Sequence, residues 1–125
     1  MKDHQKDERC RRMYEELLPN ISDYVARYAK ERPGDAAIIE HNTGETVTWK
    51  QFDTAVTAFG AKLLSIGLVK GDIIATSLPL LKEHVYLIYA CYRIGVIIAP
   101  LDLRLKTGEI IACMEQMKPK AFFFL

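Results

Sequence analysis

The residue types that most often carry out catalysis are few in this chain and widely separated. The candidates for a nucleophile or a base are three serines in capping or turn positions and three histidines: Ser22, Ser65, Ser77, His4, His41 and His84. None of the histidines has a carboxylate at a spacing that indicates a partner. Nucleophilic catalysis needs a nucleophile and a base within hydrogen-bond reach of each other. The sequence therefore indicates no catalytic residue.

The cysteines point to neither a disulfide framework nor a metal site. Cys10, Cys91 and Cys113 are an odd number, no two of them form a C-x-x-C pair, and no histidine is closely spaced with them. Disulfide frameworks and zinc sites depend on such spacings. Cys91 lies within an apolar helical stretch and is expected to be a buried thiol. This cysteine usage favours a reduced, cytoplasmic location, and we expect no metal ligands.

Arg104 is the residue whose position most favours ligand binding. It lies in the short connection between an apolar run, residues 96–99, and a helical stretch, residues 107–117. If the run is a parallel strand, Arg104 follows its carboxyl end, where open α/β sheets form their ligand crevices. Lys106 and Lys70 are weaker candidates of the same kind. The alternative is a surface arginine that faces solvent or a carboxylate.

Two helices are predicted at the N-terminus of the chain. Residues 1–20 are expected to form a charged segment with a frayed start and a short amphipathic helix, which ends at Pro19. A second helix should follow, because Asn20 and Asp23 can cap its first turn, and Pro33 with the next glycine ends it. The expected apolar face of this second helix is Ile21, Tyr24, Val25 and Tyr28.

A β-hairpin and a well-specified helix come next. Residues 36–41 and 45–48 are β-like runs, and Gly44 between them can take the left-handed conformation of a hairpin loop. Thr48 and Gln51 form the S/T-x-x-E/Q capping box, which starts a helix directly after Thr48. The expected inner face of this helix is Phe52, Ala55, Val56, Phe59, Leu63 and Ile66.

The remainder of the chain alternates strand and helix. Residues 73–76, 96–99 and 121–125 are unbroken apolar runs, which are typical of strands covered on both faces of a parallel sheet. Helical stretches at residues 81–94 and 107–117 separate them. We therefore expect an α/β fold, with N-terminal helices and a β-hairpin followed by a βαβαβ parallel-sheet unit.

The composition excludes several classes of protein. Half of the 125 residues are hydrophobic, and 17 Lys and Arg balance 16 Asp and Glu. Without a net positive field, nucleic-acid binding is not expected. No apolar stretch follows the charged N-terminus, so no secretory signal is indicated. The longest apolar region, residues 85–101, is interrupted by Arg93 and is too short to span a membrane.

Two segments carry an ordered series of motifs. Residues 46–79 read TVTWKQFDTAVTAFGAKLLSIGLVKGDIIATSLP, and residues 87–110 read LIYACYRIGVIIAPLDLRLKTGEI. They resemble the segments T-Y-x-E-L … A-x-x-L-x-x-x-G-V-x-x-G-D-x-V-A-x-x-L-P and A-x-x-x-x-G-A-x-x-x-P-L-N-P-R-L-x-x-x-E-I of the adenylate-forming (AMP-binding) superfamily. Trp49 replaces the usual tyrosine, and Asp102 with Leu103 replaces the frequent Asn-Pro. This superfamily includes acyl-CoA synthetases, luciferases and peptide-synthetase adenylation domains.

The resemblance implies that residues 21–125 are the truncated N-terminal part of an AMP-binding domain. The expected parent is an ATP-dependent acyl-CoA synthetase, which uses ATP, Mg²⁺ and CoA to convert a carboxylic acid to an acyl adenylate and then to a thioester. The family's Ser/Thr/Gly-rich phosphate loop, ribose-binding Asp and catalytic Lys have no counterpart in this sequence. We therefore expect this chain alone to be inactive and to hold no cofactor tightly. In CoA ligases the matching arginine can contact the CoA phosphates, so Arg104 is the candidate CoA-binding residue.

Two other functions are compatible with the same motifs. The chain could be a standalone ligand- or protein-binding module built on this scaffold, or part of an adenylation domain that serves a carrier protein. The coding sequence downstream of Leu125 distinguishes the module from the ligase. The last apolar run, residues 121–125, has no turn or polar tail after it, so we expect an unpaired strand edge through which the chain can self-associate.

Overall fold

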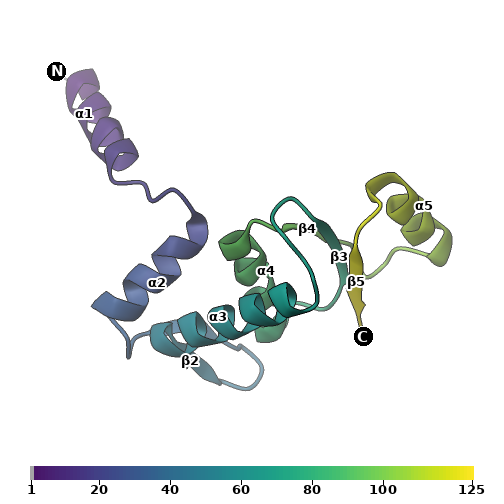
Figure 1. Ribbon diagram of the computed structural model, residues 1–125. Helices are drawn as coiled ribbons and strands as arrows, with labels where there is room; N and C mark the ends of the chain where they lie inside the picture. Colours follow the sequence, from purple (N-terminus) through teal and green to yellow (C-terminus); the bar gives the residue numbers. More distant parts are fainter. Residues whose placement is uncertain (1) are drawn as a thin grey trace.

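The structure is a computed structural model that describes the backbone of residues 2–125 and the side chains of residues 7–125. Its elements in chain order are α1 (Lys2–Glu15), α2 (Ile21–Glu31), β1 (Ala36–Ile39), β2 (Thr46–Thr48), α3 (Trp49–Ser65), β3 (Ile73–Ser77), α4 (Lys82–Ile94), β4 (Ile97–Pro100), α5 (Thr107–Met117) and β5 (Ala121–Phe124). Figure 1 shows α2, α3 and α4 gathered on one side of the three-stranded sheet and α5 on the other.

The three C-terminal strands form a parallel sheet in the order β4-β3-β5. Ile74 in the middle strand pairs with Ile98 on one side and with Ala121 on the other. The first crossover leads from β3 to β4 and the second passes back over β3, so crossovers of the same hand must place α4 and α5 on opposite faces. This arrangement confirms the expected βαβαβ unit.

The hairpin and the helix after it confirm the local signals in the sequence. β1 and β2 are antiparallel, and Gly44 in their loop has a φ of 69°. The Thr48 hydroxyl oxygen accepts a hydrogen bond of 3.2 Å from the Gln51 N–H, and the Gln51 side-chain oxygen accepts one of 2.9 Å from the Thr48 N–H. The capping box therefore fixes the start of α3 where it was predicted.

The core lies between α2, α3, α4 and the inner face of β3. The apolar residues buried there include Val25, Phe52, Val56, Leu63, Ile74, Leu87, Ala90 and Cys91. The strands are not all covered on both faces: Ile97 of β4 is 53% exposed and Phe124 of β5 is 66% exposed, as expected for three strands that only two short helices cover. The physical reason is that α5 has no buried residue and therefore covers the second face only loosely.

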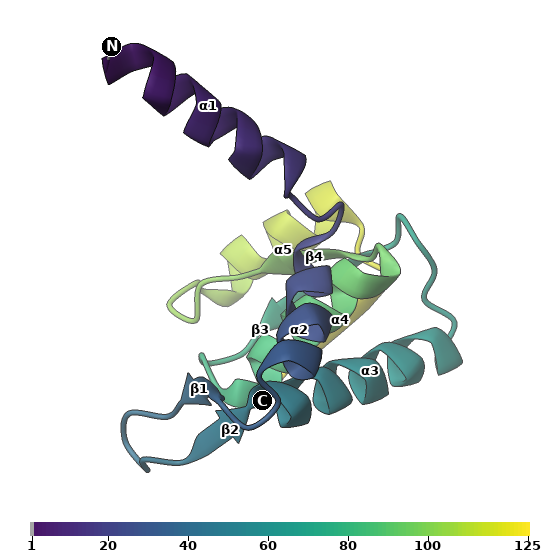
Figure 2. The ribbon, with the colours of Figure 1, turned by 90° about the vertical axis from the view of Figure 1, so that its left-hand side faces the viewer.

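The N-terminal segment and two helix ends also differ from the prediction. The charged segment is helical from Lys2, whereas Leu17 and Leu18 lie beyond the end of α1. Both views show α1 projecting away from the other elements (Figures 1 and 2), and its described side chains are exposed. Ile21 and Ile66 keep the expected helical spacing but are 54% and 52% exposed, because they stand at the ends of helices where no neighbouring element covers them.

Candidate functional site

The carboxyl ends of the three parallel strands form one edge of the sheet, and the strand-to-helix connections begin there. Ser77 of β3 pairs with Phe124 of β5, and the N–H of Leu101, directly after β4, donates a 2.7 Å hydrogen bond to the Thr76 carbonyl. Arg104 follows three residues after Leu101, in the connection to α5. The expected position of Arg104 at this edge is therefore confirmed.

The Arg104 side chain is paired with a carboxylate two residues earlier. Its Nη2 lies 2.6 Å from Asp102 Oδ2, its Nε lies 3.0 Å from Asp102 Oδ1, and its backbone N–H also donates to Oδ1 at 2.9 Å. These hydrogen bonds lower the pKa of Asp102 and raise the pKa of Arg104. The Arg104 side chain is nonetheless 89% exposed. The guanidinium is held at the sheet edge with most of its surface in solvent.

The two weaker cationic candidates lie at different ends of the sheet. Lys106 stands two residues beyond Arg104 and caps α5, where its backbone N–H donates a 2.8 Å hydrogen bond to the Glu109 carboxylate. Lys70 precedes β3 at the amino end of the sheet, and its aliphatic stem packs against Gly95. Lys106 therefore lies in the same connection as Arg104, whereas Lys70 lies at the opposite edge of the sheet.

The serines and histidines form no catalytic triad in the described part of the chain. The Ser65 hydroxyl donates to the Lys62 carbonyl at 2.7 Å, the buried Ser22 hydroxyl has no hydrogen-bond partner, and His41 is exposed in the hairpin loop. The side chain of His4 lies outside the described residues. Ser77 lies at the end of β3, but His84, in the helix that follows, is hydrogen-bonded to Thr76 and not to Ser77.

A buried pair, Thr76 and His84, was missed by the sequence analysis. Thr76 Oγ1 and His84 Nε2 are 3.0 Å apart, Thr76 is fully buried, and His84 is 6% exposed. Because Thr76 is closed to solvent, the pair is not a nucleophile and base for a soluble substrate. A threonine in an otherwise apolar strand, followed by a histidine in the first turn of the next helix, was the available signal.

Arg93 is a second residue whose contacts the sequence analysis missed. Its Nη2 lies 2.8 Å from Asp53 Oδ1 and 3.4 Å from the Ser22 carbonyl oxygen, and its Nη1 lies 2.8 Å from Thr57 Oγ1. One guanidinium on α4 therefore binds both α3 and α2. The signal was an arginine inside an otherwise apolar region, which needs polar partners when it is only 24% exposed.

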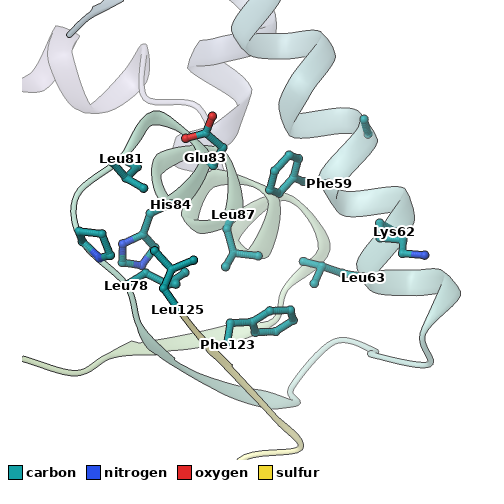
Figure 3. A pocket seen from close by; sticks show the side chains of 12 residues that line it. Phe59, Lys62, Leu63, Leu78, Leu81, Glu83, His84, Leu87, Phe123 and Leu125 are labelled. Carbon is teal, nitrogen blue, oxygen red and sulfur yellow. The ribbon is translucent and has the colours of Figure 1, made fainter. Parts of the chain in front are cut away.

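A cavity of about 560 Å³ lies between α3, α4 and the carboxyl ends of β3 and β5 (Figure 3). Leu78 and Pro79, in the connection after β3, form part of its wall, and Phe123 and Leu125 line it from β5 and the residue after it. His84 also lines this cavity. The cavity is therefore at the same edge of the sheet as the connections that carry the candidate residues.

The described side chains do not provide a metal site. No group of three or more His, Cys, Asp or Glu among them is arranged to hold a metal ion. Asp102, the carboxylate nearest to Arg104 in the sequence, is already paired with that arginine.

In the part of the chain that the structure describes, no helix is both long and apolar enough to cross a membrane.

Comparison with known proteins shows the same family over most of the chain. The family model for AMP-binding enzymes matches residues 25–124. The medium-chain fatty-acid-CoA ligase of Escherichia coli (strain K12) is 28% identical over 104 residues, which are 83% of this chain and 18% of the ligase. The hybrid PKS-NRPS synthetase gkaA of Penicillium citrinum is 30% identical over 87 residues, 70% of this chain and 2% of that protein. The chain thus spans less than a fifth of either relative.

A solved structure shares the fold. The inhibitor-bound N-terminal domain of FACL13 from Mycobacterium tuberculosis aligns with a TM-score of 0.80 at 23% identity. The alignment covers 86% of this chain and 27% of that chain. At this identity the likeness concerns the fold alone, and it confirms the α/β class with helices packed on a parallel sheet.

Proposed function

This chain belongs to the AMP-binding enzyme family, and we propose that it forms the N-terminal scaffold of an ATP-dependent acid-CoA ligase. In the complete reaction a carboxylic acid and ATP give an acyl adenylate and pyrophosphate, and the acyl group then passes to the CoA thiol. The observation that carries this proposal is the family match over residues 25–124, a range that includes all three strands of the parallel sheet. The ligase among its relatives supports the CoA-dependent form of the reaction.

Arg104 is the residue that we assign to CoA. Its guanidinium is exposed at the carboxyl edge of the sheet, where ligands of open α/β sheets bind. The planar donors of an arginine bind two phosphate oxygens together. Asp102 holds those donors in a fixed orientation before the phosphate arrives, and both are exposed enough for the phosphate to replace Asp102. Arg104 would thus bind and orient the nucleotide end of CoA.

ATP and Mg²⁺ do not fit the residues of this chain. Adenylate formation depends on positioned donors and cations around the phosphates. The sequence has no Ser/Thr/Gly-rich phosphate loop, and no acidic cluster is present among the described side chains. We therefore assign no step at ATP to these residues and infer that the chain alone neither binds ATP tightly nor forms an adenylate.

A second candidate function is adenylation for a carrier protein. The similarity to a hybrid PKS-NRPS synthetase favours it. The scaffold would be the same in both cases, and the acceptor of the acyl group would differ. A role for Arg104 at CoA would then be lost, so this residue separates the two candidates.

We also infer a cytoplasmic location, since the three cysteines are all unpaired thiols.

The experiment is to express the coding sequence together with whatever follows Leu125 and to assay both half-reactions. Acid-dependent exchange of pyrophosphate into ATP, tested with acids from acetate to decanoate, reports adenylation. Thioester formation with free CoA, compared with transfer to a carrier protein, reports the acceptor. The 125-residue chain serves as the inactive control. If a stop codon directly follows Leu125 and no acid supports exchange, the ligase proposal is wrong and the chain is a standalone module.

A further inference from the structure

We propose that α1 is a dimerisation surface, on which α1 of a second copy of this chain packs in the antiparallel direction. The family match begins at residue 25, so α1 lies outside the part of the chain that matches the AMP-binding enzymes. The inference therefore does not depend on the ligase proposal. It rests on one apolar stripe and on the charges beside that stripe.

The first observation is that α1 and the turn after it present an apolar stripe to solvent. Four exposed apolar side chains border one shallow groove: Cys10, Met13, Tyr14 and Leu17. Their spacing of three and four residues places them on one side of the helix. A surface helix normally turns such a stripe toward its own core. Figures 1 and 2 instead show α1 projecting away from the other elements, so the stripe is open to a partner.

Two opposite charges lie along the same flank of this stripe. Arg9 and Glu16 are seven residues apart, which is about two helical turns, and both border a second groove beside Met13. The turn after α1 keeps Glu16 at helical spacing, because the Glu16 N–H donates a 3.0 Å hydrogen bond to the Arg12 carbonyl. Neither Arg9 nor Glu16 forms an ion pair with another described side chain. Both charges are therefore available to a partner.

This pattern is complementary to itself when two helices pair in opposite directions. In an isologous pair, one residue contacts a second residue of the other copy, and the same contact recurs with the copies exchanged. A two-fold axis across antiparallel helices brings the same flank of each helix together. Arg9 of each copy then lies beside Glu16 of the other, and Cys10 of each lies opposite Met13 of the other. Charges and apolar groups are thus both paired in one arrangement.

Other arrangements leave the charges without partners. In a parallel pair the flank that carries Arg9 and Glu16 lies beside the opposite flank of the second copy, near Tyr14 and Ile21, where it meets no opposite charge. The chain that follows each helix would also lie at the same end of the pair and compete for space. A partner of one charge sign would satisfy only one of the two residues. The charges therefore favour an antiparallel second copy.

Sedimentation equilibrium of the 125-residue chain measures the dimer. The interface is much smaller than that of a stable complex, so we expect dimerisation at roughly 0.1 mM. All samples carry Phe124→Lys, so that the open edge of β5 does not contribute to the mass. Arg9→Glu places like charges together at two equivalent contacts and should raise the dimer Kd about tenfold. The added change Glu16→Arg reverses the second charge and should restore the dimer.

The matched control is Arg12→Glu, which makes the same change of charge on the side of α1 opposite the stripe. It should leave the dimer Kd within about twofold, because an exposed charge away from the contact contributes little. Circular dichroism of each variant checks that α1 is still helical. Equal effects of Arg9→Glu and Arg12→Glu would overturn the proposal, since net charge alone would then govern association.

Disulfide trapping determines the direction of the two helices. Lys6→Cys and Leu17→Cys are made separately in a chain that also carries Cys10→Ser and Cys113→Ser. The antiparallel register places position 6 of one copy opposite position 17 of the other, so a mixture of the two variants should cross-link under mild oxidation. Neither variant alone should do so, because equal positions then lie eleven residues apart along the pair, about 16 Å.

A parallel pair gives the reverse result, in which each variant cross-links alone and the mixed dimer does not form. That result would overturn the proposal. A monomer mass up to about 0.5 mM with no cross-link in the mixture would overturn it as well, and would leave the stripe to a segment or protein outside this chain.

Discussion

Arg93 should contribute more to stability than any exposed ion pair of this chain. Its guanidinium on α4 donates to Asp53 and Thr57 of α3 and to the backbone carbonyl of Ser22 on α2. Arg93→Met keeps the aliphatic stem and removes all three hydrogen bonds. Hydrogen bonds to charged groups contribute about 1.5 to 3 kcal/mol when well shielded. Because Arg93 and Asp53 are 24% and 32% exposed, we count the three bonds together as worth one well-shielded bond, a loss of about 2 kcal/mol in the free energy of unfolding.

For a domain of this size that loss corresponds to a fall in Tm of about 8 °C. The assay is thermal and urea unfolding, followed by circular dichroism at low micromolar protein. Asp53→Asn and the double variant complete a cycle that isolates the ion pair, with an expected coupling of about 1 kcal/mol. The control is Arg27→Met, which breaks the exposed pair with Glu31 and should lower Tm by less than about 2 °C. If Arg93→Met lowers Tm no more than Arg27→Met does, Arg93 does not hold the helices together.

Three further predictions concern separate parts of the fold. Burial raises the pKa of the Cys91 thiol to about 11, so Cys91 should resist a thiol reagent at pH 8 while exposed Cys10 reacts; rapid labelling of Cys91 in the folded chain would contradict this. The free energy of unfolding should also fall between about pH 9 and 11, because the thiol of the unfolded chain ionises at a lower pH than that of the folded chain. Thr48→Ala should lower the free energy of unfolding by about 1 kcal/mol through loss of the α3 cap, and an unchanged urea midpoint would show that the cap is dispensable. The outer edge of β5 is unpaired, so light scattering at tens of micromolar should give a mass above the monomer that Phe124→Lys reduces; a monomer mass throughout would refute it.

The sequence predicted the elements whose signals are local. The capping box at Thr48, the left-handed Gly44 and the three apolar runs each depend on residues within a few positions of one another, and the structure confirms them. The bounds of α5 agree with the prediction for the same reason. Periodicity also predicted inner faces, although it could not show that the ends of α2 and α3 lack a neighbouring element to cover Ile21 and Ile66.

The candidate site was predictable only in its position. Alternation of strand and helix placed Arg104 at the carboxyl edge of the sheet, and its pairing with Asp102 is the carboxylate alternative stated from the sequence. The contacts of Arg93 and His84 depend on distance in space, since Arg93 reaches Ser22, which lies 71 positions away in the chain. No pattern within one element contains that information. Their types alone, a charged and a titratable residue in apolar surroundings, gave the only hint.

The most direct test of the proposed function is the CoA dependence of Arg104→Ala in the longer protein. We expect the KM for CoA to rise about tenfold or more, because two phosphate oxygens lose a bidentate donor. Pyrophosphate exchange should stay nearly unchanged, and Tm should change by less than about 2 °C, since the pair with Asp102 is exposed. Arg104→Lys, which keeps the charge and loses the planar donors, should fall between the two. An unchanged KM for CoA, or a lower Tm with both half-reactions depressed together, would contradict the assignment of Arg104 to CoA.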